Sequence, residues 1–154
     1  MILDSHAHFD LILEQKGITE TDIINNLKST NVRYAVQVSI EPRGFKWSRD
    51  FAERNTNNGI FYTIGIHPSS KADNTELESF SAFTAESMQA DSSKLLLGIG
   101  ECGLDYYRMH QPRDLQIRSF EHQIDVAQKY SLPLIIHLRQ AMDEAATASD
   151  TIGQ

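Results

Sequence analysis

Residues 95–103, Leu-Leu-Leu-Gly-Ile-Gly-Glu-Cys-Gly, join an almost wholly apolar run to an acidic residue. Strands of a parallel sheet that is covered on both faces have such continuous apolar runs, whereas strands with one solvated face alternate polar and apolar residues. The run therefore predicts a buried strand over residues 95–99. Glu101 follows it between Gly100 and Gly103, which allow the backbone to bend closely around a carboxylate that can bridge two metal ions. A capping role at a strand-to-loop turn is the alternative for Glu101.

Outward from this strand, apolar runs alternate with segments of helical periodicity. The helices have recognisable start signals, such as Thr19 with acids in the following turn and Pro42 in a first turn. Strand–helix alternation with a period of about 30 residues predicts a parallel sheet with right-handed crossovers, which is an α/β barrel or an open α/β sheet. We expect further strands at residues 2–6, 34–39, 60–66 and 132–137, and helices at 19–31, 42–56, within 74–90, at 113–130 and at 140–148.

Length and composition limit the class of protein. The 154 residues, 40% of them hydrophobic and 23% charged, suit one soluble domain with a real core. No apolar run approaches the roughly 20 residues needed to span a bilayer, so we expect no membrane partner. A single cysteine, Cys102, excludes an internal disulfide, and together with a start that does not resemble a signal peptide it favours a reducing, cytoplasmic location.

The formal net charge of −7 argues against a surface that holds nucleic acid by broad phosphate neutralisation. It does not exclude a nuclease, because a metal centre supplies positive charge locally. If DNA is the substrate, we expect weak and salt-sensitive binding.

Histidines stand at the ends of several predicted strands. His6 and His8 are two residues apart, so their side chains share a face of an extended chain and can chelate a divalent metal ion. His137 ends an apolar strand, where an imidazole needs a partner, either a metal ion or a backbone carbonyl. His67 is a candidate ligand or phosphate donor. Because carboxyl ends of parallel strands meet at one edge, we predict that these histidines and Glu101 form one site.

Other polar residues near these positions are weaker candidates. Arg108 and Arg139 can meet a phosphate, although surface packing explains them as well. His110 and His122 are expected to be solvated, and Cys102 is expected to be a small buried filler rather than a nucleophile.

Four stretches follow one another in the chain: DSHAHFD (4–10), GIHP (65–68), GIGECGLDYYR (98–108) and LPLIIHLR (132–139). In this order they resemble successive signatures of the TatD family of metal-dependent deoxyribonucleases, which belongs to the amidohydrolase-like (β/α) barrel superfamily. The resemblance implies a partial TIM-type barrel, not closed within the chain, because a complete barrel takes eight strands and about 250 residues. It implies a TatD-like hydrolase domain over residues 1–141, followed by a frayed tail at 142–154.

The resemblance also implies the roles of the site residues. His6 and His8 would bind one metal ion, Glu101 would be the catalytic carboxylate that bridges two ions, and His137 would bind the second. His67 would lie near the scissile phosphate of DNA, with Arg108 and Arg139 as further substrate-binding residues. Up to two divalent ions, magnesium, manganese or zinc, are implied as cofactors.

Two later family signatures, a His near His-Cys-Phe-Ser-Gly and an Asp near Thr-Asp-x-Pro, have no counterpart in residues 1–154. We therefore expect the N-terminal part of a TatD-type enzyme with an incomplete site. One alternative is an inactive metal-binding fragment that needs complementation or self-association through an unpaired sheet edge. Another is an amidohydrolase that acts on C–N bonds.

Overall fold

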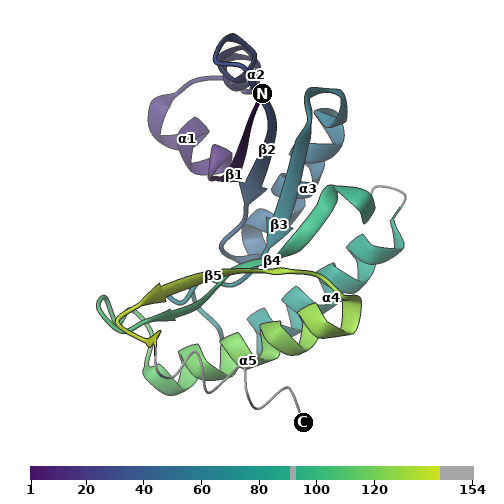
Figure 1. Cartoon of the computed structure of the whole chain (residues 1–154). Helices are drawn as coiled ribbons and strands as arrows, with labels where there is room; N and C mark the ends of the chain where they lie inside the picture. The colour runs from purple at the N-terminus through teal and green to yellow at the C-terminus, as the bar shows by residue number, and fades with distance from the viewer. Residues whose placement is uncertain (91–92, 143–154) are drawn as a thin grey trace.

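A computed structural model describes residues 1–90 and 93–142 of the chain. Five parallel strands form one sheet in the order β1-β2-β3-β4-β5, curled into a half-barrel with helices between successive strands (Figure 1). This confirms the predicted partial TIM-type barrel. The strands are β1 (Ile2–Ala7), β2 (Val32–Val38), β3 (Ile60–Ile64), β4 (Leu96–Asp105) and β5 (Leu134–Arg139).

The helices differ from the prediction at one main point. Helix α1 directly follows the first strand and was not predicted, because its short sequence buries only Phe9 and so has no clear apolar stripe. At α2, Thr19 and Asp22 bond reciprocally as the expected capping box, and Pro42 lies in the first turn of α3. The helices are α1 (Phe9–Lys16), α2 (Glu20–Ser29), α3 (Pro42–Arg54), α4 (Asn74–Gln89) and α5 (Arg113–Tyr130), with short 3₁₀ turns at Thr56–Asn58 and Ser93–Leu95.

Strand β4 extends further than the sequence predicts. The prediction ended it at residue 99 because glycines follow, but pairing with β5 continues through Cys102↔Ile136 to Asp105↔Arg139. Glu101 therefore lies inside β4 rather than in a loop after it. The sequence predicts a helix at 140–148 and a frayed tail at 142–154. Residues 143–154, which include most of both, lie outside the described residues.

The core lies between the sheet and the helices. Phe45 and Phe51 of α3 and Phe80 of α4 are almost completely buried, as their periodicity predicts. Burying each such side chain contributes roughly 1.5–3 kcal/mol. A second, smaller cluster joins β4, β5 and α5 around Leu104 and Phe120. Helix α5 therefore packs against one face of β4 and β5, which fixes the positions of these two strands.

Within the described residues, β1 and β5 each pair with a single strand, so the sheet has two free edges. Leu3 on β1 is 58% exposed and Ile136 on β5 is 48% exposed. The barrel is not closed by the described residues, as expected. No helix in this part of the chain combines the length and apolarity that a bilayer crossing requires.

Candidate metal centre

The Glu101 carboxylate lies among four imidazoles. Its Oε2 atom lies 3.3 Å from His6 Nε2 and 3.6 Å from His8 Nε2. Its Oε1 atom lies 3.0 Å from His137 Nδ1 and 3.8 Å from His67 Nε2. Each carboxylate oxygen therefore faces a different pair of imidazoles, and the four imidazoles come from three separate parts of the chain.

The first group, His6, His8 and Glu101, has the spacing of ligands around one ion. The two Nε2 atoms are 3.2 Å apart, and each is within 3.6 Å of Glu101 Oε2. Ligands that are each about 2.1 Å from a shared ion lie roughly 3.0–3.5 Å from one another. His8 Nδ1 is 2.8 Å from the Val38 carbonyl oxygen, to which it donates, so the lone pair of His8 is at Nε2. This group therefore fits a divalent metal ion.

The second group consists of His67, Glu101 and His137, whose ligand atoms lie within 4.8 Å of one another. His137 has its ring between two acids, with Nδ1 toward Glu101 and Nε2 3.2 Å from Asp105 Oδ2. Both ring nitrogens of His137 thus face a carboxylate oxygen, and the tautomer that donates from Nε2 to Asp105 leaves the Nδ1 lone pair available for a metal ion beside Glu101. Such a carboxylate–histidine pair is the usual outer support of a metal ligand.

Asp105 is itself held firmly. Its Oδ1 accepts the backbone N–H groups of Tyr107 (3.1 Å) and Arg108 (2.8 Å), and its own N–H donates to Gln116 Oε1 at 2.7 Å. Burial acts to raise the pKa of Asp105, but the hydrogen bonds from Arg108 N–H and from His137 outweigh it and lower that pKa. Asp105 therefore stays ionised and can fix the tautomer of His137, a role that the sequence did not reveal.

His67 has the tautomer opposite to that of His8. Its Nδ1 accepts the Ser69 N–H at 3.1 Å and lies 2.6 Å from Ser69 Oγ, so the neutral ring carries its proton at Nε2. Burial lowers the pKa of His67 to about 4, which keeps the ring neutral. An N–H group therefore points toward Glu101. His67 is suited to donate to a substrate oxygen, not to offer a lone pair to a metal ion.

Two buried glutamines fix the chain next to the histidines. Gln37 Oε1 accepts the N–H of Phe9 at 2.6 Å, directly after His8. Gln123 Oε1 accepts the N–H of Ile66 at 2.7 Å, directly before His67, and its Nε2 donates to the Ile66 carbonyl at 3.0 Å. Because both glutamines are fully buried, these bonds hold the strand ends that carry the imidazoles.

The glycine before Glu101 lets β4 and β5 approach closely. Gly100 has φ of 140°, and a Cβ there would lie 2.3 Å from the Ile135 carbonyl oxygen. Any other residue would push the strands apart and separate Glu101 from His137. Gly100 therefore allows β4 and β5 to come close enough for Glu101 to reach His137, as its position next to Glu101 in the sequence suggests.

The two candidate arginines lie at the same end of the sheet. The Arg139 guanidinium stacks on the Tyr107 ring, 3.8 Å from its centroid, at the carboxyl end of β5. Arg108 follows β4 in the exposed loop that leads to α5. No contact that the structure records joins either guanidinium to Glu101 or to the histidines.

The remaining candidates lie outside this cluster. Cys102 is buried, and burial raises the pKa of its thiol to about 12, which suits a packing role. His110 is exposed, as expected. His122, for which we expected a solvated position, is partly buried and lies 2.7 Å from Ser81 Oγ, because α4 packs against α5.

Comparison with known proteins gives a consistent result. The sequence profile of TatD-related DNases matches residues 3–152. An uncharacterized metal-dependent hydrolase of Bacillus subtilis strain 168, YabD, is 30% identical over 147 residues, which are 96% of this chain and 54% of that protein. A protein of Erwinia amylovora named 3'-5' ssDNA/RNA exonuclease TatD is 33% identical over 91 residues, 58% of this chain and 33% of that protein.

A solved structure has the same fold. The crystal structure of YjjV, a TatD homologue from Escherichia coli K12, superposes with a TM-score of 0.80 at 22% identity, over 97% of this chain and 55% of that one. The chain spans about half the length of these curated relatives.

Proposed function

Since the chain belongs to the family of TatD-related DNases, we propose that it provides the metal-binding part of a two-metal phosphodiesterase that acts on DNA. The observation that carries this proposal is the Glu101 carboxylate, whose two oxygens face separate groups of imidazoles. A carboxylate placed in this way is suited to bridge two ions.

The positions of the donor atoms support the following assignment of ligands. His6 Nε2, His8 Nε2 and Glu101 Oε2 would hold one ion, and Glu101 Oε1 with His137 Nδ1 would hold the other. Bound divalent ions in such a pair lower the pKa of a water molecule and polarise a phosphoryl oxygen. His137 offers only one lone pair, which faces Glu101 because Asp105 takes the proton on its other nitrogen. The chain therefore offers the second ion fewer ligands than the first.

The substrate contacts come from donors around the metal centre. His67 Nε2–H points into the site and would donate to a non-bridging phosphate oxygen. Arg108 and Arg139 lie at the same edge and would meet neighbouring phosphates, since guanidinium groups bind them in a bidentate manner. Because the whole chain has a net charge of −7, binding of DNA is expected to be weak and salt-sensitive.

A cleavage assay tests this function. The purified chain with Mn²⁺ is expected to shorten 5'-labelled single-stranded DNA, and a chelator is expected to stop it. His67→Gln is expected to lower kcat/KM by about 10- to 100-fold with unchanged metal content, the effect of losing one hydrogen bond to a charged group. The exposed His110→Gln is the control. Metal binding without cleavage would show a fragment that is inactive by itself, and hydrolysis of a cyclic amide would show an amidohydrolase.

We also propose that residues 1–141 form the metal-dependent hydrolase domain and that its free sheet edges support self-association. Leu3 and Ile136 expose apolar surface on the edge strands β1 and β5. Pairing of these edges with strands of a second copy would remove that surface from water. Light scattering of the purified chain is expected to give a mass above the 17.4 kDa of one copy. A stable monomer across micromolar concentrations would contradict this expectation.

A further inference from the structure

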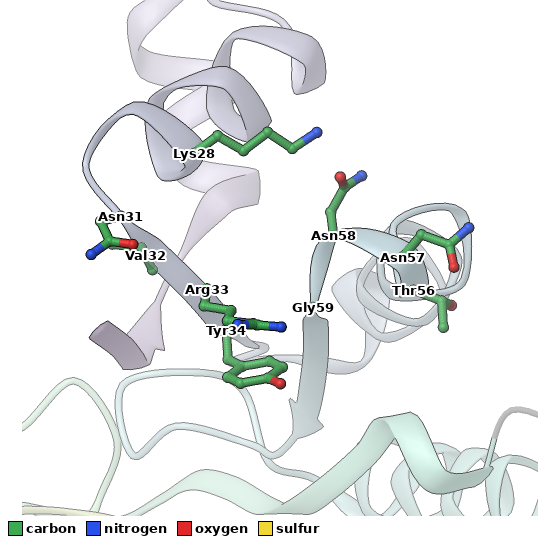
Figure 2. Close-up of a pocket in the computed structure, with 9 residues that line it drawn as sticks. All are labelled: Lys28, Asn31, Val32, Arg33, Tyr34, Thr56, Asn57, Asn58 and Gly59. Atoms are coloured by element: carbon green, nitrogen blue, oxygen red, sulfur yellow. The ribbon is translucent and has the colours of Figure 1, made fainter. Parts of the chain in front are cut away.

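A pocket of about 390 Å³ opens at the amino ends of β2 and β3, away from the metal centre (Figure 2). Strand β2 begins at Val32 beside this pocket and ends at Val38, whose carbonyl contacts His8. At about 3.3 Å per residue the two ends of β2 are about 20 Å apart. The pocket is therefore separate from the site described above, and it is within the volume range of small-molecule sites.

The charges that line this pocket are all positive. Lys28 and Arg33 are its charged residues, and no carboxylate lines it. Neither of them has an ion-pair partner among residues 1–90 and 93–142, whereas Arg43, Lys46 and Arg54 each pair with an acid. The C-terminal end of α2 accounts for a cation at Lys28, but not for Arg33 on β2. In a chain with a net charge of −7, this pocket has uncompensated positive charge.

The other residues that line the pocket are neutral, and they suit a ligand that has polar and aromatic groups in addition to an anionic group. Asn31, Asn57, Asn58 and Tyr34 line it as well, and the Asn58 side-chain amide also donates to Asn55 Oδ1 at 3.1 Å. Figure 2 shows the Lys28 side chain extending from α2 toward the side of Asn58, with Tyr34 below both. The backbone of Asn31 makes the turn before β2 by bonding to the Lys28 carbonyl and to the Ile2 N–H, so its side-chain amide is not used for that turn.

The floor of the pocket depends on one glycine. Gly59 has φ of 74°, and a Cβ there would lie 2.3 Å from the Arg33 carbonyl oxygen and 2.8 Å from Tyr34 Cδ1. Glycine therefore lets the start of β3 come close to the Arg33 backbone and the Tyr34 ring of β2.

We propose that this pocket binds a nucleotide. Lys28 and Arg33 hold the phosphate, the Tyr34 ring stacks on the base, and the asparagine amides bond to the base edge. The ligand is either a free nucleoside 5'-monophosphate or the terminal nucleotide of a strand, since both offer the same phosphate and base. The inference does not rest on the metal centre, because the pocket needs no ion and lies at the other end of the sheet.

Titrations of the metal-free chain, followed by amide NMR shifts, test this proposal. AMP is expected to shift the amides of Asn31 and Gly59, inorganic phosphate is expected to bind at least tenfold more weakly, and adenosine weaker still. The double variant Lys28→Gln/Arg33→Gln is expected to weaken AMP binding at least tenfold. The control, Lys16→Gln/Lys129→Gln, makes the same change of charge on exposed residues outside the pocket and is expected to leave AMP binding unchanged.

Two further measurements separate the parts of the proposal. Tyr34→Leu is expected to weaken AMP binding without affecting inorganic phosphate. If a 5'-phosphorylated oligonucleotide binds the pocket and AMP displaces it, the ligand is the terminal nucleotide of a strand. If AMP binds and the oligonucleotide does not, the ligand is the free nucleotide. Equal AMP affinity in the double variant, or inorganic phosphate binding as tightly as AMP, would overturn the proposal. The titrations use the metal-free chain, so their outcome for AMP binding does not depend on whether the chain is an active nuclease.

Discussion

Replacing Glu101 with alanine is expected to remove most of the metal from the chain. The wild type is expected to bind one to two divalent ions, because both carboxylate oxygens face imidazole nitrogens at 3.0–3.6 Å. Without this side chain, the first group keeps two imidazoles and the second loses the oxygen nearest to His137. Loss of an outer-shell partner alone weakens metal binding by about 10- to 100-fold, so loss of a bridging ligand is expected to exceed about 100-fold.

Metal content per chain, measured by mass spectrometry after dialysis, and Mn²⁺ titration calorimetry test this expectation. Glu101→Gln keeps the shape and one oxygen acceptor, and its affinity is expected to lie between those of Glu101→Ala and the wild type. The variant Glu121→Ala is the control, because Glu121 is an exposed acid on α5. Equal metal content in the wild type and in Glu101→Ala would remove Glu101 from the site.

The sequence predicts the sheet well because its strands are continuous apolar runs and its helices have start signals. Thr19 with Asp22, and Pro42, mark two helix starts that the structure confirms. Helix α1 escapes prediction because eight residues that bury a single side chain have little periodicity. The end of β4 escapes it because glycines at 100 and 103 indicate a loop locally, whereas pairing with β5, which lies more than thirty residues later in the chain, keeps the strand extended.

The residues that hold the site in place are harder to predict than the residues that form it. Histidines at strand ends stand out, since an imidazole at the end of an apolar strand needs a partner. Gln37, Gln116 and Gln123 carry no such signal, because a glutamine in a strand or helix is usually solvated. Asp105 had a usable signal. It lies four residues after Glu101, and in an extended strand this even spacing places both acids on one face.

Asp105→Asn is expected to change the tautomer of His137 while the fold stays intact. The amide oxygen of asparagine can still accept the N–H groups of Tyr107 and Arg108, so the turn after β4 keeps its bonds. The amide NH₂ group then faces His137 Nε2, which has to accept instead of donate. The ring proton therefore moves to Nδ1, where it faces Glu101 Oε1 and removes the lone pair meant for a metal ion.

The affinity for the second ion is expected to fall by about 10- to 100-fold in this variant, with little effect on the first. Nitrogen-15 shifts of the His137 ring in the metal-free chain distinguish Nδ1–H from Nε2–H, and a purely structural role for Asp105 would not change them in a folded variant. Asp114→Asn, at an exposed position in the first turn of α5, is the control. An unchanged tautomer together with unchanged metal affinity would mean that Asp105 only supports the turn and does not determine which nitrogen of His137 carries the proton.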